Sequence, residues 1–215
     1  MKIKFLTNNK QTIAKINQFI EAWNTQDSFV VSTSGSTGRP AQITIQKEHM
    51  VNSAKMTGAF LGLNRGDTAL LCLSIDTIGG KMMLVRSLVL GLELYVMEAN
   101  SDPLESIEQS FDFVAMVPMQ VKHSISNQRD LSAIKNLIIG GAPISAGLYN
   151  AIAEIGMNAF QTFGMTETIS HIAMRKINHT HPPYQILEGV RIHQDGEQLV
   201  IDAPHLGVNQ LKTND

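Results

Sequence analysis

Apolar positions along the chain follow two spacings. In one set of segments they recur three and four residues apart, which places them on one face of a helix. In the other set, short apolar or alternating runs stand between turn residues, which is typical of strands. The first pattern predicts helices over residues 11–23, 47–61, 81–90 and 103–109, from residue 118, and over 145–155. The second predicts strands over residues 29–31, 41–45, 68–73, 92–97, 113–117, 137–139 and 158–163.

The order of these segments predicts the fold class. Strands and helices alternate from residue 68 to residue 163, which favours an α/β fold with a mostly parallel sheet flanked by helices. After His171 the sequence turns to loops and two short strands, 190–193 and 198–201, which form a hairpin around Asp195-Gly196. We therefore expect an α/β core over residues 1–178 and a small β subdomain at the C-terminal end, residues 179–215.

Composition narrows the class of protein. With 215 residues, 43% of them hydrophobic, the chain can bury a sizeable core. A net charge of -2 with scattered Lys and Arg argues against nucleic acid or an anionic membrane as partner. The single cysteine, Cys72, lies in an apolar run, so we expect a small buried residue and no internal disulfide. No apolar run reaches the ~18 residues of a membrane helix and no signal-type segment opens the chain, so we expect no membrane span and a cytoplasmic protein.

A loop of glycines and hydroxyl residues stands between two predicted strands. It reads Ser-Thr-Ser-Gly-Ser-Thr-Gly-Arg-Pro over residues 32–40. Its glycines allow backbone N–H groups to converge on an anion, and its hydroxyls and Arg39 supply further donors. The alternative is a solvated Ser/Gly linker. It is not the G-x-x-x-x-G-K-[ST] phosphate loop, because the only Gly-Lys pair, Gly80-Lys81, is followed by methionine.

A second polar segment follows the last predicted strand of the core, at the kind of strand end where open α/β sheets bind ligands. Residues 161–168 read Gln-Thr-Phe-Gly-Met-Thr-Glu-Thr. The ring of Phe163 could stack on a base, Thr166 could bond a phosphate, and Glu167 could hold Mg²⁺. The alternative is an ordinary helix start, since Thr-Glu-Thr also suits that role.

Taken together these segments resemble the adenylate-forming superfamily of acyl-CoA synthetases, luciferases and peptide-synthetase adenylation domains. The family loop T-S-G-S-T-G-x-P-K matches residues 33–40, and its Y-G-x-T-E motif matches residues 163–167. Its G-G-A/E-x and T-G-D motifs resemble residues 140–143 and 213–215. The resemblance covers residues 28–215 and implies catalytic roles for Thr166 and Glu167, with Glu167 as the Mg²⁺ ligand. It implies an ATP site formed by Thr33, Ser34, Gly35, Ser36, Thr37, Gly38, Gly140, Gly141, Ala142, Phe163, Gly164, Thr166 and Asp215.

The sequence departs from the family pattern at several positions. Ala41 stands where the loop lysine is expected, Phe163 replaces tyrosine, and Asn214 replaces glycine. The family histidine of P-x-x-H falls on Thr77, or on Asp76 if the register slips by one. The chain also stops near the expected hinge and has little of the usual N-terminal subdomain, so we expect a large-domain fragment without the C-terminal lid.

The segment 79–86 indicates which acid is activated. It resembles the helix of 2-succinylbenzoate–CoA ligases of menaquinone biosynthesis, in which an arginine that matches Arg86 binds a substrate carboxylate. The resemblance implies substrate contacts from Thr77, Gly80, Arg86 and Met165. Arg86 sits in an apolar run, where an unpaired charge is costly. Two alternatives stay open for it: the side chain reaches water, or it pairs with an internal acid. Fatty acids and amino acids also stay open as substrates.

The resulting prediction is an AMP-forming acid–CoA ligase. ATP with Mg²⁺ and a small carboxylic acid would form an acyl-adenylate in the 1–178 core, and coenzyme A would then take the acyl group. Two alternatives are a binding domain without turnover and an adenylation module that loads a carrier protein; a homodimer stays open. Ser170 and His171 are not expected to pair, because neighbours on a strand point to opposite faces. His179 and His181 are expected to be surface loop residues rather than a metal pair.

Overall fold

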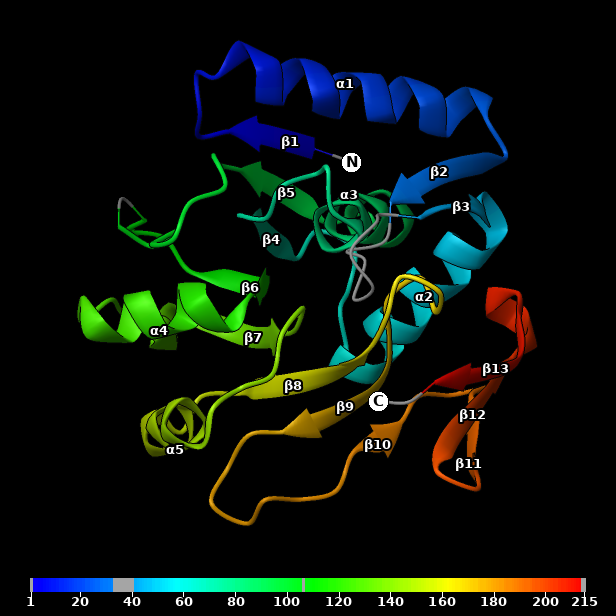
Figure 1. The fold of residues 1–215 in the computed structure, drawn as a ribbon. Coiled ribbons are helices and arrows are strands. Elements are labelled where there is room, and N and C mark those ends of the chain that lie inside the picture. Colours follow the sequence, from blue (N-terminus) through cyan, green and yellow to red (C-terminus); the bar gives the residue numbers. More distant parts are fainter. Residues whose placement is uncertain (1, 33–40, 106, 214–215) are drawn as a thin grey trace.

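The structure is a computed structural model that describes residues 2–32, 41–105 and 107–213 (Figure 1). Its elements follow in chain order: β1 (Lys2–Phe5), α1 (Lys10–Thr25), β2 (Ser28–Ser32), β3 (Gln42–Gln46), α2 (Lys47–Leu61), β4 (Thr68–Leu71), α3 (Ile78–Leu90), β5 (Glu93–Val96), β6 (Phe111–Met116), α4 (Pro118–Ser126), η1 (Leu131–Ala133), β7 (Ile134–Ile139), α5 (Ala146–Ile155), β8 (Ala159–Gly164), β9 (His171–Lys176), β10 (Gln185–Ile186), β11 (Arg191–Asp195), β12 (Gln198–Ala203), η2 (Pro204–Leu206) and β13 (Val208–Thr213).

An eight-stranded sheet in the order β1-β5-β4-β6-β7-β8-β9-β10 forms the centre of the molecule. Pairings along this order are parallel from β1 to β8 and antiparallel from β8 to β10. Parallel strands need crossover connections, and α3, α4 and α5 supply them between successive strands. The predicted fold class, an α/β fold with a mostly parallel sheet, is confirmed.

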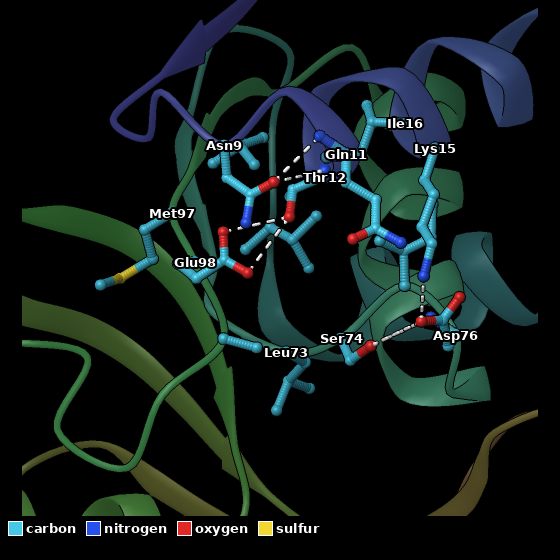
Figure 2. A pocket seen from close by; sticks show the side chains of 14 residues that line it. Asn9, Gln11, Thr12, Lys15, Ile16, Leu73, Ser74, Asp76, Met97 and Glu98 are labelled. Atoms are coloured by element: carbon cyan, nitrogen blue, oxygen red, sulfur yellow. Dashed lines mark hydrogen bonds and ion pairs between the residues drawn. The ribbon is translucent and has the colours of Figure 1, made fainter.

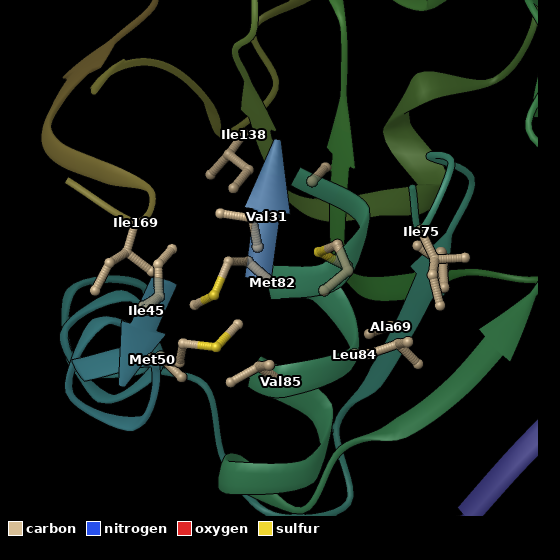
Figure 3. Packing of buried hydrophobic residues seen from close by; sticks show 14 of the residues in the cluster. Val31, Ile45, Met50, Ala69, Ile75, Met82, Leu84, Val85, Ile138 and Ile169 are labelled. Carbon is tan, nitrogen blue, oxygen red and sulfur yellow. The ribbon is translucent and has the colours of Figure 1, made fainter. Parts of the chain in front are cut away.

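Two hydrophobic clusters line the two faces of this sheet. Alternate residues of one strand enter different clusters, as the pleat requires: Leu71 of β4 packs in the larger cluster and Leu70 in the smaller. The larger cluster joins the sheet to α1, α2 and α3, and Figure 3 shows Met50 of α2 beside Met82 and Val85 of α3 within it. The smaller cluster contains apolar side chains of α4 and α5. The predicted buried position of Cys72, in the smaller cluster, is confirmed.

Capping residues in the sequence set the ends of helices α3 and α5. The side chain of Thr77 caps α3 by accepting a hydrogen bond from the N–H of Gly80, and Gly91 ends that helix in the left-handed region with φ 72°. The hydroxyl of Ser145 caps α5 in the same way. The position of each helix is therefore fixed by its own cap as well as by packing.

The structure differs from the sequence-based expectations at some elements. Residues 103–105 form a turn and residues 107–109 are irregular, in place of the expected helix, because Leu104 and Ile107 are too few apolar positions to hold one. Strands β1, β9, β10 and β13 were not predicted. β1 is short and half exposed, and it gains its ladder only by pairing with β5, which is distant in sequence.

The C-terminal residues form a separate three-stranded antiparallel sheet, β11-β12-β13. The predicted hairpin is confirmed, since Asp195 pairs with Gln198 across the β11–β12 turn. Figure 1 shows this sheet beside α2, where the side chain of Asn52 donates to the carbonyl of His205 at 2.8 Å. The division into residues 1–178 and 179–215 stays a prediction. No helix in the described ranges is long and apolar enough to cross a membrane.

Candidate functional site

The carboxyl ends of the parallel strands bring the predicted motifs to one edge of the large sheet. Residues 140–142 follow β7, and residues 165–170 follow β8, its neighbour in the sheet. The strands that carry the two segments are joined at this end, because the hydroxyl of Thr162 on β8 donates to the carbonyl of Ile139 on β7 at 3.2 Å. Open α/β sheets bind ligands at this edge. The fold therefore places Gly140, Gly141 and Ala142 next to the segment that carries Phe163 to Glu167.

The turn after β8 is held by one buried hydroxyl. Thr168 accepts from the N–H of Met165 at 3.0 Å and lies 3.0 Å and 2.7 Å from the carbonyl oxygens of Met165 and Ser170. Gly164 lies so close to Ser170 that a Cβ on it would be 2.3 Å from that carbonyl oxygen. Ile169 has φ 68°, a strained conformation for a β-branched residue. Strain held by surrounding contacts is typical of functional sites.

The turn presents the two predicted catalytic residues differently. Thr166 is buried, whereas the carboxylate of Glu167 is exposed. No group of three His, Cys, Asp or Glu side chains gathers as a metal site within the described ranges. Mg²⁺ is usually held by one or two carboxylates together with substrate phosphates, so the exposed carboxylate of Glu167 fits that ion.

Phe163 belongs to an aromatic cluster that sequence reasoning missed. Its ring makes an edge contact with Tyr184, with centroids 6.1 Å apart. Arg175 stacks between Tyr184 and Tyr149, with its guanidinium carbon 4.8 Å and 5.3 Å from their ring centres, and donates to Gln161. The buried Nε of Arg175 has no hydrogen-bond partner in the described part of the chain. The cluster therefore contacts the ring of Phe163 and links β8 to β9 through Gln161 and Arg175.

Arg86 on α3 is the most deeply buried charge near this edge. Only 1% of its surface is exposed, so it does not reach water. Its Nε donates to the hydroxyl of Thr57 at 3.2 Å and its Nη2 to that of Ser170 at 2.6 Å. No ion pair joins it to an acidic residue of the described ranges. Both alternatives for Arg86, exposure and an internal acid, are therefore wrong for the described residues; burial lowers its pKa to about 9.

The expectation that Ser170 and His171 do not pair is wrong. The hydroxyl of Ser170 lies 3.3 Å from Nδ1 of His171, and Nε2 of the same ring lies 3.0 Å from the hydroxyl of Thr57. The alternation rule fails because β9 begins at His171, so Ser170 belongs to the preceding bend. Thr57 gave no local signal in the sequence, since it reaches this site from α2.

The remaining predicted substrate residues have identifiable structural roles. Thr77 caps α3, and its hydroxyl also donates to the carbonyl of Ser74 at 2.7 Å. A Cβ on Gly80 would lie 2.2 Å from that carbonyl oxygen, so only glycine fits this contact. Met165 is half-buried and packs against the larger cluster. Their contact with an acid stays a prediction.

A pocket of about 110 Å³ opens at the same edge between α1 and the ends of β4 and β5 (Figure 2). Its polar groups are paired with one another. Lys15 and Asp76 form an ion pair at 2.6 Å, and Thr12 donates to Glu98 at 3.1 Å. Lys15 lowers the pKa of Asp76 through this contact. Asp76 is therefore engaged away from Arg86.

Part of the predicted ATP site lies outside the described residues. It comprises Thr33, Ser34, Gly35, Ser36, Thr37, Gly38 and Asp215. The residues that flank the glycine loop are described: β2 and β3 pair antiparallel, with Ser32 opposite Gln42. The two strands on either side of the loop are thus neighbours.

The fold and this edge define an α/β protein whose candidate ligand site follows β7 and β8. More narrowly, the chain belongs to the AMP-binding enzyme family, whose model matches residues 6–198. The family resemblance found in the sequence is confirmed.

Two curated relatives share the name 2-succinylbenzoate–CoA ligase. The protein of Bacillus cytotoxicus is 25% identical over 207 residues, which cover 86% of this chain and 43% of that protein. The protein of Listeria monocytogenes is 27% identical over 203 residues, 88% of this chain and 43% of that protein. The chain thus spans less than half the length of these relatives.

Solved structures agree with this family. An acyl-CoA synthetase (AMP-forming)/AMP-acid ligase II-like protein from Dyadobacter fermentans has a TM-score of 0.89 and 36% identity, and the match covers 97% of this chain and 62% of that one. O-succinylbenzoate coenzyme A synthetase from Bacillus subtilis, in complex with AMP, has a TM-score of 0.71 and 23% identity over 82% of this chain and 50% of that one. At that identity the second likeness shows the fold alone.

Proposed function

We propose that this chain is the nucleotide- and acid-binding core of an AMP-forming acid–CoA ligase. Phosphates of ATP would lie in the loop of residues 34–38 and against Thr166, and the ribose would bind Asp215. Adenine would lie between residues 140–142 and Phe163. The adjacency of the segments after β7 and β8 supports this arrangement, because it brings the adenine and phosphate contacts to one sheet edge. Glu167 would hold Mg²⁺, which would neutralise phosphate charge.

The reaction would be a pair of displacements. A carboxylate oxygen of the acid attacks the α-phosphorus of ATP, the bond to pyrophosphate breaks, and an acyl-adenylate forms. The thiol of coenzyme A then attacks the acyl carbonyl, loses its proton, and AMP leaves. Such chemistry depends mainly on positioning and on stabilising negative charge. Coenzyme A as second substrate and a cytoplasmic location belong to this proposal.

The proposed acid is 2-succinylbenzoate, a dicarboxylate. One carboxylate would be adenylated and the other would meet Arg86. The observation that carries this choice is the burial of the Arg86 guanidinium without an acidic partner in the described ranges. A buried cation is costly unless an anion joins it, and a second carboxylate of the substrate would supply that anion. The names of the curated relatives point to the same acid.

ATP–pyrophosphate exchange on the full-length protein tests this function. We expect exchange with 2-succinylbenzoate, much weaker exchange with the same acid lacking one carboxylate, and none with a straight-chain fatty acid. Glu167→Gln should lower exchange about 100-fold or more, whereas Glu154→Gln, an exposed change on α5, should not. Exchange with another acid only would contradict the substrate. ATP binding without exchange for any acid would favour a binding domain without turnover, which Ala41 at the loop lysine position motivates.

A further inference from the structure

Four side chains form a closed hydrogen-bonded ring beside the proposed acid site. Arg86 Nε is 3.2 Å from the Thr57 hydroxyl, which is 3.0 Å from Nε2 of His171. Nδ1 of His171 is 3.3 Å from the Ser170 hydroxyl, which is 2.6 Å from Arg86 Nη2. Arg86, Thr57 and His171 are each buried, and they come from α3, α2 and the start of β9. His171 therefore contacts both hydroxyls that accept from Arg86.

The chemistry of the ring selects one tautomer of His171. Thr57 also lies 3.1 Å from the carbonyl of Ser53, which can only accept, so its hydroxyl proton goes there. Its oxygen then accepts from Arg86 and from Nε2–H of His171. Nδ1 is left bare and accepts the hydroxyl proton of Ser170, whose oxygen accepts from Arg86. The opposite tautomer would leave the Ser170 proton without an acceptor among its described contacts.

The hydrogen-bonded ring of four side chains holds only one positive charge, that of Arg86. Burial lowers the pKa of His171 well below its usual value, and the neighbouring Arg86 lowers it further. The groups that face the imidazole are Thr57 of α2, Ser170 of the preceding bend and Arg86 of α3; the first two are neutral. A protonated imidazole would place a second cation beside Arg86 and lose its acceptor for Ser170.

We propose that neutral His171 is a positioning residue for Arg86: it turns both hydroxyls so that their oxygen lone pairs hold the guanidinium in one orientation. The ring uses two of the five N–H groups of Arg86. The others keep a fixed direction in which a second substrate carboxylate can be bound. The identity of that carboxylate rests on the proposed function, whereas the positioning of Arg86 does not.

Nuclear magnetic resonance of ¹⁵N-labelled protein tests the positioning without any acid. We expect a protonated Nε2 and a bare Nδ1 for His171 from pH 8 to pH 6, and a slowly exchanging Nε–H signal of Arg86. A variant that lacks the imidazole assigns the His171 signals among the seven histidines. A protonated Nδ1, or an imidazolium in this range, would overturn the proposal.

Two variants of similar size separate hydrogen bonding from packing. Asn at position 171 retains an acceptor for Ser170, whereas Leu retains none. His171→Leu should weaken binding of 2-succinylbenzoate about tenfold, the scale of one lost hydrogen bond to a charged group, and should expose the Arg86 Nε–H to exchange. His171→Asn should retain much of the affinity for 2-succinylbenzoate and much of the protection of the Arg86 Nε–H. Affinity for ATP and for the acid lacking one carboxylate should change less than about twofold in each variant.

These experiments distinguish a failure of the His171 positioning from a failure of the substrate assignment. Equal effects of the Leu and Asn variants on Arg86 exchange would refute positioning by His171, whichever acid is bound. Equal affinity of the wild type for the two acids would refute the substrate assignment instead, and the His171 tautomer and Arg86 exchange would still decide the positioning. If the Leu variant fails to fold, those two wild-type signals and the Asn variant give the same decision.

Discussion

Arg86 combines a cost to stability with a gain in binding. Its guanidinium is buried and its partners Thr57 and Ser170 are neutral, so its desolvation is only partly offset. We expect Arg86→Met to leave the free energy of unfolding unchanged or raise it by up to about 2 kcal/mol. Affinity for 2-succinylbenzoate should fall at least about tenfold, because a buried charge pair is lost. Urea denaturation and calorimetry measure the two effects.

Arg129 provides a control for that experiment. It is partly exposed and forms an ion pair with Asp102 at 2.8 Å, so Arg129→Met removes a compensated charge and should lower stability without changing acid binding. A loss of more than about 2 kcal/mol in Arg86→Met would show that the ring contributes more than the buried charge costs.

His171 should make the protein less stable in mild acid. Its folded pKa is lowered, so below pH 6.5 the unfolded chain binds a proton that the folded chain excludes. Stability is therefore full above pH 6.5 and falls with pH below it, by up to about 1.4 kcal/mol per pH unit for one group. Urea denaturation at pH 7, 6 and 5 should show that the free energy of unfolding falls less steeply with pH for His171→Asn than for the wild type. The pH dependence that remains in the variant would come partly from His205, whose pKa is also lowered by burial.

For single residues, the sequence was enough to single out Arg86 but not to predict which side chains surround it. Arg86 stood out as a charge in an apolar run, and the structure buries it. Thr57 lies 29 positions from Arg86 and 114 positions from His171, so no local pattern could join them. Ser170 and His171 were misjudged because the start of β9 decides their geometry, and strand boundaries are poorly fixed by sequence.

Among the elements, α3 depends on one close backbone contact. A Cβ on Gly80 would lie 2.2 Å from the carbonyl oxygen of Ser74, which is backbone and cannot rotate away. We expect Gly80→Ala to lower the free energy of unfolding by about 1–3 kcal/mol, as overpacking does. Gly79→Ala is the matched control on the same turn, because its Cβ would meet only side-chain atoms at ordinary contact distance, of Leu73 at 3.4 Å and of Thr77 at 3.9 Å. Thermal denaturation of both variants measures the difference, and equal effects would contradict this packing.

The elements themselves were predicted where local signals and packing agree. The helix over residues 47–61 has the bounds of α2, since apolar spacing and Gly62 at its end act together. The pairing of β1 was missed because its ladder with β5 joins residues far apart in the chain. The edge site was predicted because parallel strands carry their ligands at their carboxyl ends, which requires no knowledge of pairing order.

For the whole molecule, the C-terminal sheet shares its core with the distant N-terminal helix. Leu206 of η2 belongs to the same hydrophobic cluster as Trp23 of α1, through α2 and α3. We therefore expect the described elements to unfold together. Leu206→Ala removes a side chain that is 3% exposed and should lower stability by about 2–5 kcal/mol.

Trp23 makes this prediction measurable, because it is the only tryptophan and belongs to the same cluster as Leu206 although it lies on the N-terminal helix. The urea midpoint from its fluorescence should move as far in Leu206→Ala as the midpoint from far-ultraviolet circular dichroism. Met119→Ala, an exposed change on α4, should move neither. The C-terminal sheet would unfold independently if, in Leu206→Ala, the urea midpoint from circular dichroism fell while the midpoint from Trp23 fluorescence stayed unchanged. It would then be a separate unit, as the division at residue 178 predicts, and acid binding at the ring would survive its loss.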